Sequence, residues 1–315
     1  MIAICSSANR GKGQGMELRV VETFLKVAEV GSFSHAAVKL GYSQSAVTMQ
    51  IKQLEAELGA ALFERVPRGV ILTDAGRTFA FHAHILMEAA SAAAAAVSPA
   101  SDEGDLTGTL RIGSVESTAT SLLPPVLAAF AREHPAAQVV VVTSALEELA
   151  DKCRRGELDL ILTFEQPITL PGFTRETLRD EAVVLAAAPG LVPEADTTLD
   201  PEGLAHLPFV LTERGESYRH DFDRALAEHD IVVTPTIETG STEMLVRLAA
   251  DGAGVALVPR FSASAALETG SLAQLRTTLE LPRMAIQVLY RDQKWVTPVM
   301  EAFMRLLRSA IAQNA

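Results

Sequence analysis

The stretch FSHAAVKLGYSQSAVTMQIK, residues 33–52, predicts two short helices joined by a tight turn at Gly41-Tyr42. Gly41 can end the first helix with a positive φ, and Ser43 is a good N-cap for the second helix. The second helix is expected to run on to about residue 58, because apolar residues recur in it at helical spacing. We expect these residues on one buried face: Val47, Ile51, Leu54 and Leu58.

The opposite face of the second helix carries small hydroxyls, amides and one cation. Such groups near a helix N-terminus suit the floor of a DNA major groove. An ordinary solvated amphipathic helix has the same pattern, so the helix alone leaves both interpretations open. The candidate DNA-binding residues of this stretch are Ser43, Gln44, Ser45, Thr48, Met49, Gln50 and Lys52.

A basic turn follows between two short apolar runs. Residues 61–63 and 70–72 are expected to pair as strands, and the Pro/Gly turn between them predicts a wing. Arg65 and Arg68 in this turn would lie near a phosphate backbone. A solvated hairpin tip is the alternative, and the neighbouring helices favour the wing.

Residues 16–73 as a whole resemble the winged helix-turn-helix domain of the LysR-type transcriptional regulators. The matching motifs are SFSHAAVKL, SQSAV, IKQLEAELGAALFER and LTDAG, in the family's order and spacing. The resemblance implies a sequence-specific DNA-binding regulator that a small-molecule effector controls. Its implied partners are double-stranded promoter DNA, the effector and further copies of the chain in a homodimer or homotetramer, and a contact with RNA polymerase is left open. Residues 1–15 precede the point where chains of this family usually begin, so we expect a disordered extension there.

Length and composition indicate two or three domains, because 315 residues with 48% hydrophobic residues can bury sizeable cores. The two cysteines, Cys5 and Cys153, provide no disulfide framework, so we expect a reducing, cytoplasmic compartment. The sequence has no run of eighteen apolar residues, so we expect no membrane span. Residues 1–15 lack the apolar core of a signal peptide.

The net charge of −12 belongs to the C-terminal part of the chain. Residues 1–100 hold nine Lys/Arg and eight Asp/Glu, a net charge of +1, whereas residues 101–315 hold eighteen and thirty-one, a net charge of −13. A DNA-binding domain usually has a strongly basic face. We therefore expect phosphate contacts from individually placed residues (Lys52, Arg65 and Arg68) and from the pairing of several such domains.

A long helix is predicted directly after the wing. Thr73-Asp74 can cap it, and it extends over about residues 75–97 with many small side chains. Small side chains permit the close approach of a second helix. The family resemblance makes residues 74–100 the linker and dimerisation helix.

From Thr109 onward, strands and helices alternate, which predicts a parallel βαβ sheet. One continuous helix is expected over residues 120–134, and short strands are expected at residues 182–187 and 233–238, among others. The resemblance implies that residues 101–315 are the family's effector-binding region, an α/β periplasmic-binding-protein-like domain of two subdomains that the chain crosses twice. We expect subdomain I at about 108–175 and 283–315, and subdomain II at about 176–282.

A ligand of such a fold binds in the cleft between the subdomains, near helix N-termini. Two hydroxyl pairs at expected helix starts, Ser117-Thr118 and Ser241-Thr242, could hold a carboxylate there. Plain N-caps are the alternative role of each pair. A small anionic effector, in particular a carboxylate, is therefore our expectation.

Two further residues complete the expected effector site. Arg219 could pair with an anionic ligand, or it could form a surface ion pair with Asp221 or Asp223. Leu146 stands where many relatives place Ser or Thr facing the cleft. We expect it to favour an apolar portion of the ligand.

Two other function classes fit the sequence less well. The chain has no CxxC, HExxH, Gly-rich phosphate loop or GxSxG motif, so we predict no catalytic residue, no metal site and no cofactor. Cys153 beside Arg154-Arg155 is expected at an apolar helix position rather than as an activated thiolate. A cytoplasmic ligand-binding protein without a regulatory role would account for residues 109–315 only.

Overall fold

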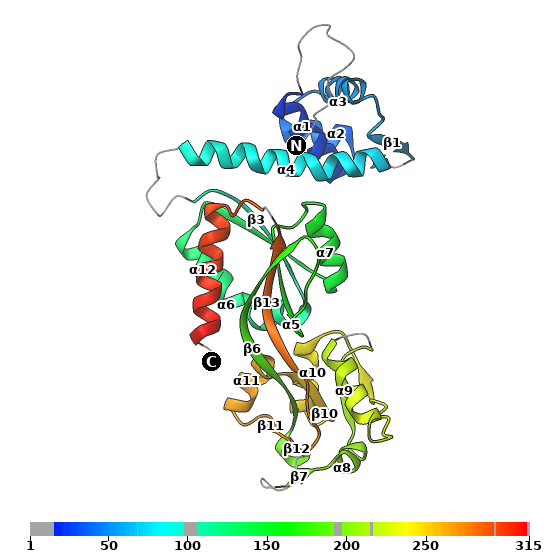
Figure 1. Cartoon of the computed structure of the whole chain (residues 1–315), viewed down its shortest axis with the longest axis vertical. Coiled ribbons are helices and arrows are strands. Elements are labelled where there is room, and N and C mark those ends of the chain that lie inside the picture. The colour runs from blue at the N-terminus through cyan, green and yellow to red at the C-terminus, as the bar shows by residue number, and fades with distance from the viewer. Residues whose placement is uncertain are drawn as a thin grey trace. The chain divides into compact units, whose positions relative to one another are not determined.

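The computed structural model describes residues 16–67, 69–97, 106–191, 197–214, 217–292 and 294–313. It divides into two compact units, Met1–Ser98 and Pro99–Ala315. The expected extension at residues 1–15 and the candidate Arg68 lie outside the described residues. In Figure 1 the first unit is coloured blue to cyan and the second green to red.

A helix-turn-helix opens the first unit, as predicted. The unit begins with three helices, α1 (Leu18–Val30), α2 (Phe33–Leu40) and α3 (Gln44–Leu58). Gly41 ends α2 with a φ of 70°, which glycine adopts at little cost. Ser43 caps α3, because its side chain accepts a hydrogen bond from the Ala46 amide at 3.2 Å.

An antiparallel hairpin, the wing, follows α3. It consists of β1 (Phe63–Val66) and β2 (Gly69–Leu72). One carboxylate oxygen of Glu55 accepts hydrogen bonds from the amides of Leu62 and Phe63 at 2.7 and 3.2 Å. These bonds hold residue 62 against α3, so the first strand begins at Phe63, later than the expected 61–63. Arg65 therefore lies within β1 and not in the turn.

Aromatic rings form the centre of the first unit's core. The Phe24 ring lies 5.2 Å from the Phe63 ring and 4.9 Å from the Phe79 ring. Phe79 belongs to the long helix α4 (Asp74–Val97), so the start of this helix is anchored in the same core. Leu58 was expected on the buried face of α3, and this was wrong: it is the last residue of the helix and is 42% exposed.

The second unit is built on a nine-stranded sheet in the order β4-β3-β5-β13-β6-β10-β8-β9, with β11 also paired to β6. Its strands are β3 (Gly108–Ser114), β4 (Ala137–Thr143), β5 (Leu160–Glu165), β6 (Phe173–Ala187), β8 (Phe209–Leu211), β9 (Ile237–Glu238), β10 (Val255–Pro259), β11 (Ala273–Gln274) and β13 (Arg283–Arg291). A separate two-stranded sheet pairs β7 (Thr198–Leu199) with β12 (Arg276–Thr277). The helices are η1 (Pro189–Leu191), α5 (Glu116–Ser121), α6 (Leu123–Glu133), α7 (Leu146–Arg154), α8 (Pro201–Ala205), α9 (Ser217–Ala227), α10 (Thr242–Ala250), α11 (Arg260–Glu268) and α12 (Pro298–Gln313).

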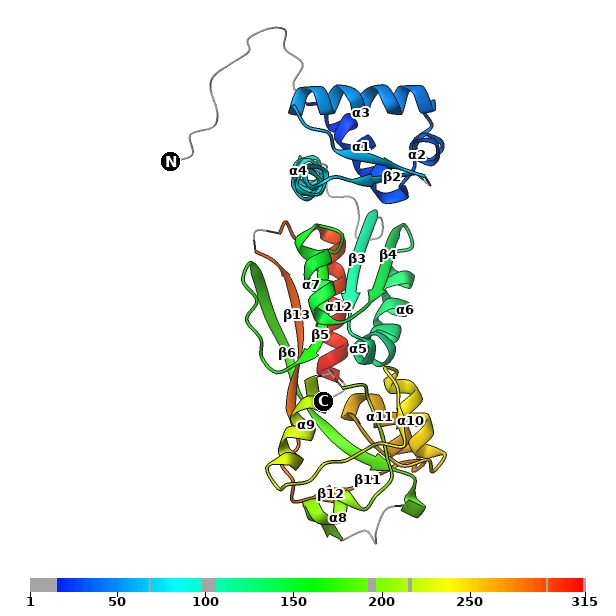
Figure 2. The same ribbon diagram turned by 90° about the vertical axis from the view of Figure 1, so that its right-hand side faces the viewer.

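The long strand β6 runs through two halves of this unit (Figures 1 and 2). Its residues 173–182 pair with β13, and its residues 183–187 pair with β10 and β11. We call the part with β3, β4, β5 and β13 the first half, and the part with β8 to β11 the second half. The subdomain boundary expected near residue 175 falls inside β6. Because β6 and β13 are antiparallel to their neighbours, the sheet is mixed, and the all-parallel prediction was wrong.

Helices cover both faces of the sheet in the first half. Leu160 and Leu162 belong to the core cluster under α6 and α12, where the rings of Phe130 and Phe303 lie 5.8 Å apart. Ile161, between the two leucines, belongs to the cluster under α7. Alternate residues of a strand point to opposite faces, so the two clusters lie on opposite sides of the sheet.

The helix expected over residues 120–134 is in fact two helices. α5 ends at Ser121 and α6 begins at Leu123, because Pro124 and Pro125 lack the amide hydrogens that a continuous helix needs. The strand expected at 233–238 is reduced to the two residues of β9. The break leaves α5 as a short helix that begins at Glu116, directly after β3.

Candidate functional site

Five of the predicted DNA-binding residues line one open depression on α3. They are Gln44, Ser45, Thr48, Met49 and Lys52. Met49 is 69% exposed. The Thr48 hydroxyl donates to the Gln44 carbonyl at 2.9 Å, whereas the Gln44 side chain makes no hydrogen bond within the described part of the chain. The depression therefore offers the free side-chain amide of Gln44, hydroxyl groups and an apolar side chain. Groups of these kinds contact base edges.

The other two candidates from this stretch lie beside the depression. Ser43 caps α3, and its hydroxyl is 3.0 Å from that of Ser45. Gln50 is half-buried, and its Oε1 is buried without a hydrogen-bond partner among the described residues. Neither side chain is among those that line the depression.

The cations of the first unit form two groups. Four are paired with carboxylates of the same unit: Arg19 with Glu17, Lys26 and Lys39 with Glu29, and Arg77 with Asp74. Lys52 and Arg65 are exposed and have no ion pair within residues 16–67 and 69–97. These two were predicted to contact phosphates. They are the described cations of this unit whose charge no local carboxylate offsets.

A cleft lies between the two halves of the second unit. Strands β3, β5 and β8 end there, and α5, α9 and α10 begin there. The residues that line it include Glu116, Ser117, Phe164, Thr212, Tyr218 and Thr242. Ser117 and Thr242 are thus the predicted effector residues that the fold brings together.

A carboxylate of the chain itself occupies the N-terminus of α10. Glu116 Oε2 accepts a hydrogen bond from the Thr242 amide at 2.9 Å, where unpaired amides and the helix dipole favour negative charge. Ser241 caps the same helix by accepting a hydrogen bond from the Met244 amide at 3.3 Å. The space left in the cleft is about 10 Å³, room for about one water molecule. The cleft is therefore closed, and Glu116 fills the position in which we expected an effector carboxylate.

The structure places three other predicted effector residues outside this cleft. Thr118 is fully buried, and its hydroxyl lies 2.7 Å from that of Ser114, which ties α5 to β3. Leu146 packs against the apolar cluster under α7. Arg219 lines a separate cavity. Thr118 follows Ser117 by one helical residue, about 100° further around the helix, so the two hydroxyls cannot face the same way.

Sequence reasoning missed Glu116, Phe164 and Thr212. Two of them had a usable signal: Phe164 lies near the carboxyl end of β5 and Thr212 directly follows β8, and ligands of open α/β sheets bind at such ends. Glu116 precedes Ser117 and carries the charge that a helix N-terminus attracts. Its contact with Thr242 spans 126 positions in sequence, so no local pattern predicts it.

Two family models match the chain. The LysR substrate binding domain matches residues 103–312, and the bacterial regulatory helix-turn-helix protein of the lysR family matches residues 18–77. The chain belongs to the LysR family of bacterial transcriptional regulators. It is a DNA-binding transcriptional regulator with an effector-binding domain, as the sequence motifs implied.

Similarity to individual proteins extends over nearly the whole regulator. The HTH-type transcriptional regulator CbbR of Rhodospirillum rubrum is 31% identical over 297 residues, 93% of this chain and 96% of CbbR. Full-length OxyR of Pseudomonas aeruginosa was solved as a cysteine variant. It matches with a TM-score of 0.73 and 24% identity, and the match covers 95% of this chain and 95% of OxyR. CbnR, solved in complex with its target DNA, has a TM-score of 0.57 at 25% identity over 93% of this chain and 99% of CbnR.

None of the described helices combines the length and the apolar character that a membrane span requires. No cluster of three His, Cys, Asp or Glu side chains among the described residues could hold a metal ion.

Cys153 of the regulator is a core residue. It is fully buried in the cluster under α7, beside Leu149 and Ile161. Burial raises the pKa of its thiol from the ordinary value of 9.0 to about 11, because the apolar surroundings disfavour the thiolate. The thiolate is the reactive form, so this cysteine is not poised for redox chemistry.

We expect Cys153 to be inert toward thiol reagents in the folded regulator. In a Cys5→Ser background, maleimide labelling near neutral pH should be about a hundredfold slower than in the unfolded chain, since two pKa units lower the thiolate fraction that much. The folded state binds this proton more tightly than the unfolded state, so the contribution of Cys153 to stability should fall as pH rises from 9.0 toward 11. Rapid labelling without unfolding would contradict the assignment.

Proposed function

We propose that the regulator reads its operator with the depression on α3. The observation that carries the proposal is that one open surface is lined by Gln44, Ser45, Thr48, Met49 and Lys52. The packing of the core does not require these side chains to share a surface. The relative CbnR was solved in complex with its target DNA, which supports the same use here. In this arrangement Gln44 hydrogen-bonds a base edge, Met49 contacts an apolar group such as a thymine methyl, and Lys52 holds a phosphate. Arg65 holds a phosphate from the wing, and contact with RNA polymerase stays a prediction.

Gln44→Ala should weaken binding to the specific operator by about 1–3 kcal/mol and leave binding to random DNA almost unchanged. Arg65→Ala should weaken both and flatten the salt dependence, because a phosphate contact carries no sequence information. Fluorescence anisotropy with operator and scrambled duplexes over a range of salt concentrations measures both effects.

Gln53→Ala is the matched control for this experiment. Gln53 lies on the same helix, is exposed and bonds Glu57 at 3.2 Å, but it does not line the depression. Its replacement should leave operator binding intact. Wild-type operator affinity in Gln44→Ala, or an equal loss in Gln53→Ala, would show that the reading surface lies elsewhere.

We infer that α4 pairs two copies of the regulator, as a dimer or within a tetramer. Ile85 supports this, because it is a large apolar side chain on α4 that is 38% exposed. Leu86 packs instead against the core of its own unit. A charge at Leu86 would therefore unfold the unit, and Ile85 is the position that probes pairing alone.

Ile85→Glu should shift the regulator to monomers in sedimentation velocity and abolish the operator footprint, since one helix-turn-helix unit buries too little surface for tight binding. Ile71→Glu is the control, because Ile71 is 50% exposed on β2 and lies outside α4. The control should keep the wild-type oligomeric state. A monomeric Ile85→Glu protein that still gives the full footprint would refute pairing through α4.

We propose further that the effector is a small carboxylate that binds in the cleft in place of Glu116. The Thr242 amide at the start of α10 already donates a hydrogen bond to a carboxylate at 2.9 Å. The same amide can donate to the carboxylate of a ligand. Two buried aromatic side chains that line the cleft suit the apolar part of such a ligand: the rings of Phe164 and Tyr218 lie 6.3 Å apart. The hydroxyl of Thr212 lines the cleft and is buried without a hydrogen-bond partner among the described residues. A ligand oxygen would satisfy it.

Glu116→Gln should tighten carboxylate binding by about tenfold, because it removes the competing charge from the α10 N-terminus. Glu243→Gln is the control: Glu243 lies in the first turn of α10 but pairs with Arg247 outside the cleft, and its replacement should have little effect. Thermal-shift screening of the full chain against carboxylates, amines and neutral sugars measures both. Stabilisation by amines or sugars only, or equal responses in the two variants, would refute the carboxylate.

A further inference from the structure

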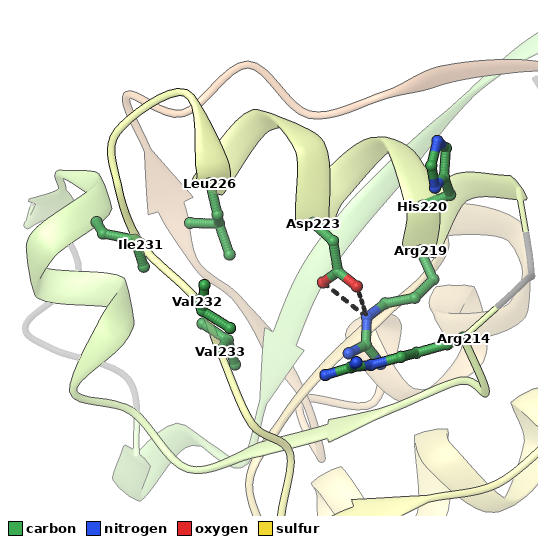
Figure 3. Close-up of a pocket in the computed structure, with 8 residues that line it drawn as sticks. All are labelled: Arg214, Arg219, His220, Asp223, Leu226, Ile231, Val232 and Val233. Atoms are coloured by element: carbon green, nitrogen blue, oxygen red, sulfur yellow. Dashed lines mark hydrogen bonds and ion pairs between the residues drawn. The ribbon is translucent and has the colours of Figure 1, made fainter.

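A second cavity, of about 260 Å³, lies against α9 and shares no lining residue with the cleft. Figure 3 shows its two ends. The polar end is formed by Arg214, Arg219, His220 and Asp223. The apolar end is formed by Leu226 of α9 and by Ile231, Val232 and Val233 of the following segment. A cavity with cations at one end and branched aliphatic side chains at the other suits an amphipathic ligand.

Arg219 is the fixed cation of this cavity, since it is 0% exposed. Its Nε donates to both carboxylate oxygens of Asp223 at 2.8 and 2.9 Å. Its Nη1 donates to the Thr212 carbonyl at 2.8 Å and lies 3.6 Å from Glu238 Oε1. Its Nη2 is buried and has no hydrogen-bond partner among the described residues. A buried charged donor without an acceptor is costly, so this atom favours a ligand that brings one.

Arg214 supplies a second cation at the same end. It lines the same cavity as Arg219 (Figure 3), and its side chain makes no ion pair or hydrogen bond within the described part of the chain. Two cations that line one cavity attract an anionic group of a ligand. The flat, forked shape of each guanidinium group matches the two oxygens of a carboxylate.

Charge and size restrict the ligand further. The carboxylates of Asp223 and Glu238 both pair with Arg219, and Arg214 has no such pair among the described residues. With one cation left to offset, a singly charged anion suits the site better than a phosphate or a dicarboxylate. The volume of about 260 Å³ is below the range of about 300–1,000 Å³ of drug-sized pockets. We propose that this cavity is a second ligand site, for a small monocarboxylate with a branched aliphatic body. The carboxylate would lie at Arg219 Nη2 and Arg214, and the aliphatic body against Leu226 and Val233. The proposal does not depend on the effector proposed for the cleft.

The experiment is isothermal titration calorimetry of the full chain with 4-methylpentanoate, compared with the uncharged 4-methylpentanamide. Arg214→Gln should weaken carboxylate binding by about tenfold without disturbing the fold, because the Arg214 side chain is exposed and makes no hydrogen bond or ion pair among the described residues. Val232→Trp should block the cavity, since Val232 lines it and is 81% exposed. Arg224→Gln is the matched control, as Arg224 lies on the same helix but pairs with Asp221 outside the cavity.

Hydrogen exchange then locates the bound carboxylate. We expect added protection in residues 217–227 and 231–233, in wild type and in Arg224→Gln, but not in Val232→Trp. Binding that responds to Glu116→Gln and not to Arg214→Gln would assign the carboxylate to the cleft and overturn this proposal while leaving the proposed effector site intact. The proposal also fails if the amide binds as tightly as the carboxylate, or if neither calorimetry nor hydrogen exchange detects 4-methylpentanoate.

Discussion

Strand β6 is the element on which the C-terminal unit depends, because it belongs to the sheet of both halves. Residues 173–182 pair with β13 and residues 183–187 pair with β10 and β11. A strand that is hydrogen-bonded along nearly its whole length does not bend as a loop does. A separation of the two halves would therefore have to twist β6. Contacts across the cleft include hydrogen bonds of Glu116 with the Thr242 amide, of Ser121 with Ser262 and of Gln166 with Asp221. The Phe164 ring also packs against the rings of Tyr218 and Phe261 across the cleft.

The hydrogen bond between Glu116 and the Thr242 amide would compete with an anionic ligand for the N-terminus of α10. A helix N-terminus attracts a carboxylate whether the carboxylate belongs to a ligand or to the chain. Glu116 is held nearby by β3 and α5, so it competes at a high effective concentration. An anionic ligand must therefore displace a tethered group and also open the cleft, whose present volume is about 10 Å³. In the proposed effector site, Glu116 would link the occupancy of the cleft to the separation of the two halves, and such a link is the kind of two-state element that effector control needs.

Features fixed by local physical chemistry could be predicted from the sequence, and features fixed by distant contacts could not. The buried stripe of α3 follows from apolar residues at helical spacing, and Val47, Ile51 and Leu54 are buried as expected. The first part of β6 was missed, because residues 174–181 alternate irregularly between exposed and half-buried positions and contain few apolar residues. Arg219 was expected at a ligand or at the surface, yet it is fully buried. Its burial depends on Asp223 one turn away and on the Thr212 carbonyl, and only the fold brings that carbonyl within reach.

The charge of the first unit also bears on how the regulator binds DNA. Most of its described cations are already paired with carboxylates of the same unit, and the exceptions are Lys52 and Arg65. Each phosphate contact releases about one counterion, so affinity grows with the number of such contacts. Two unpaired cations in the described part of one unit contribute little electrostatic affinity for DNA. Several copies on one operator add their phosphate contacts together. They also add their base contacts, which carry the specificity. Low affinity of a single unit then becomes useful, because a unit that binds DNA weakly alone binds tightly only where the spacing of two half-sites matches the assembly.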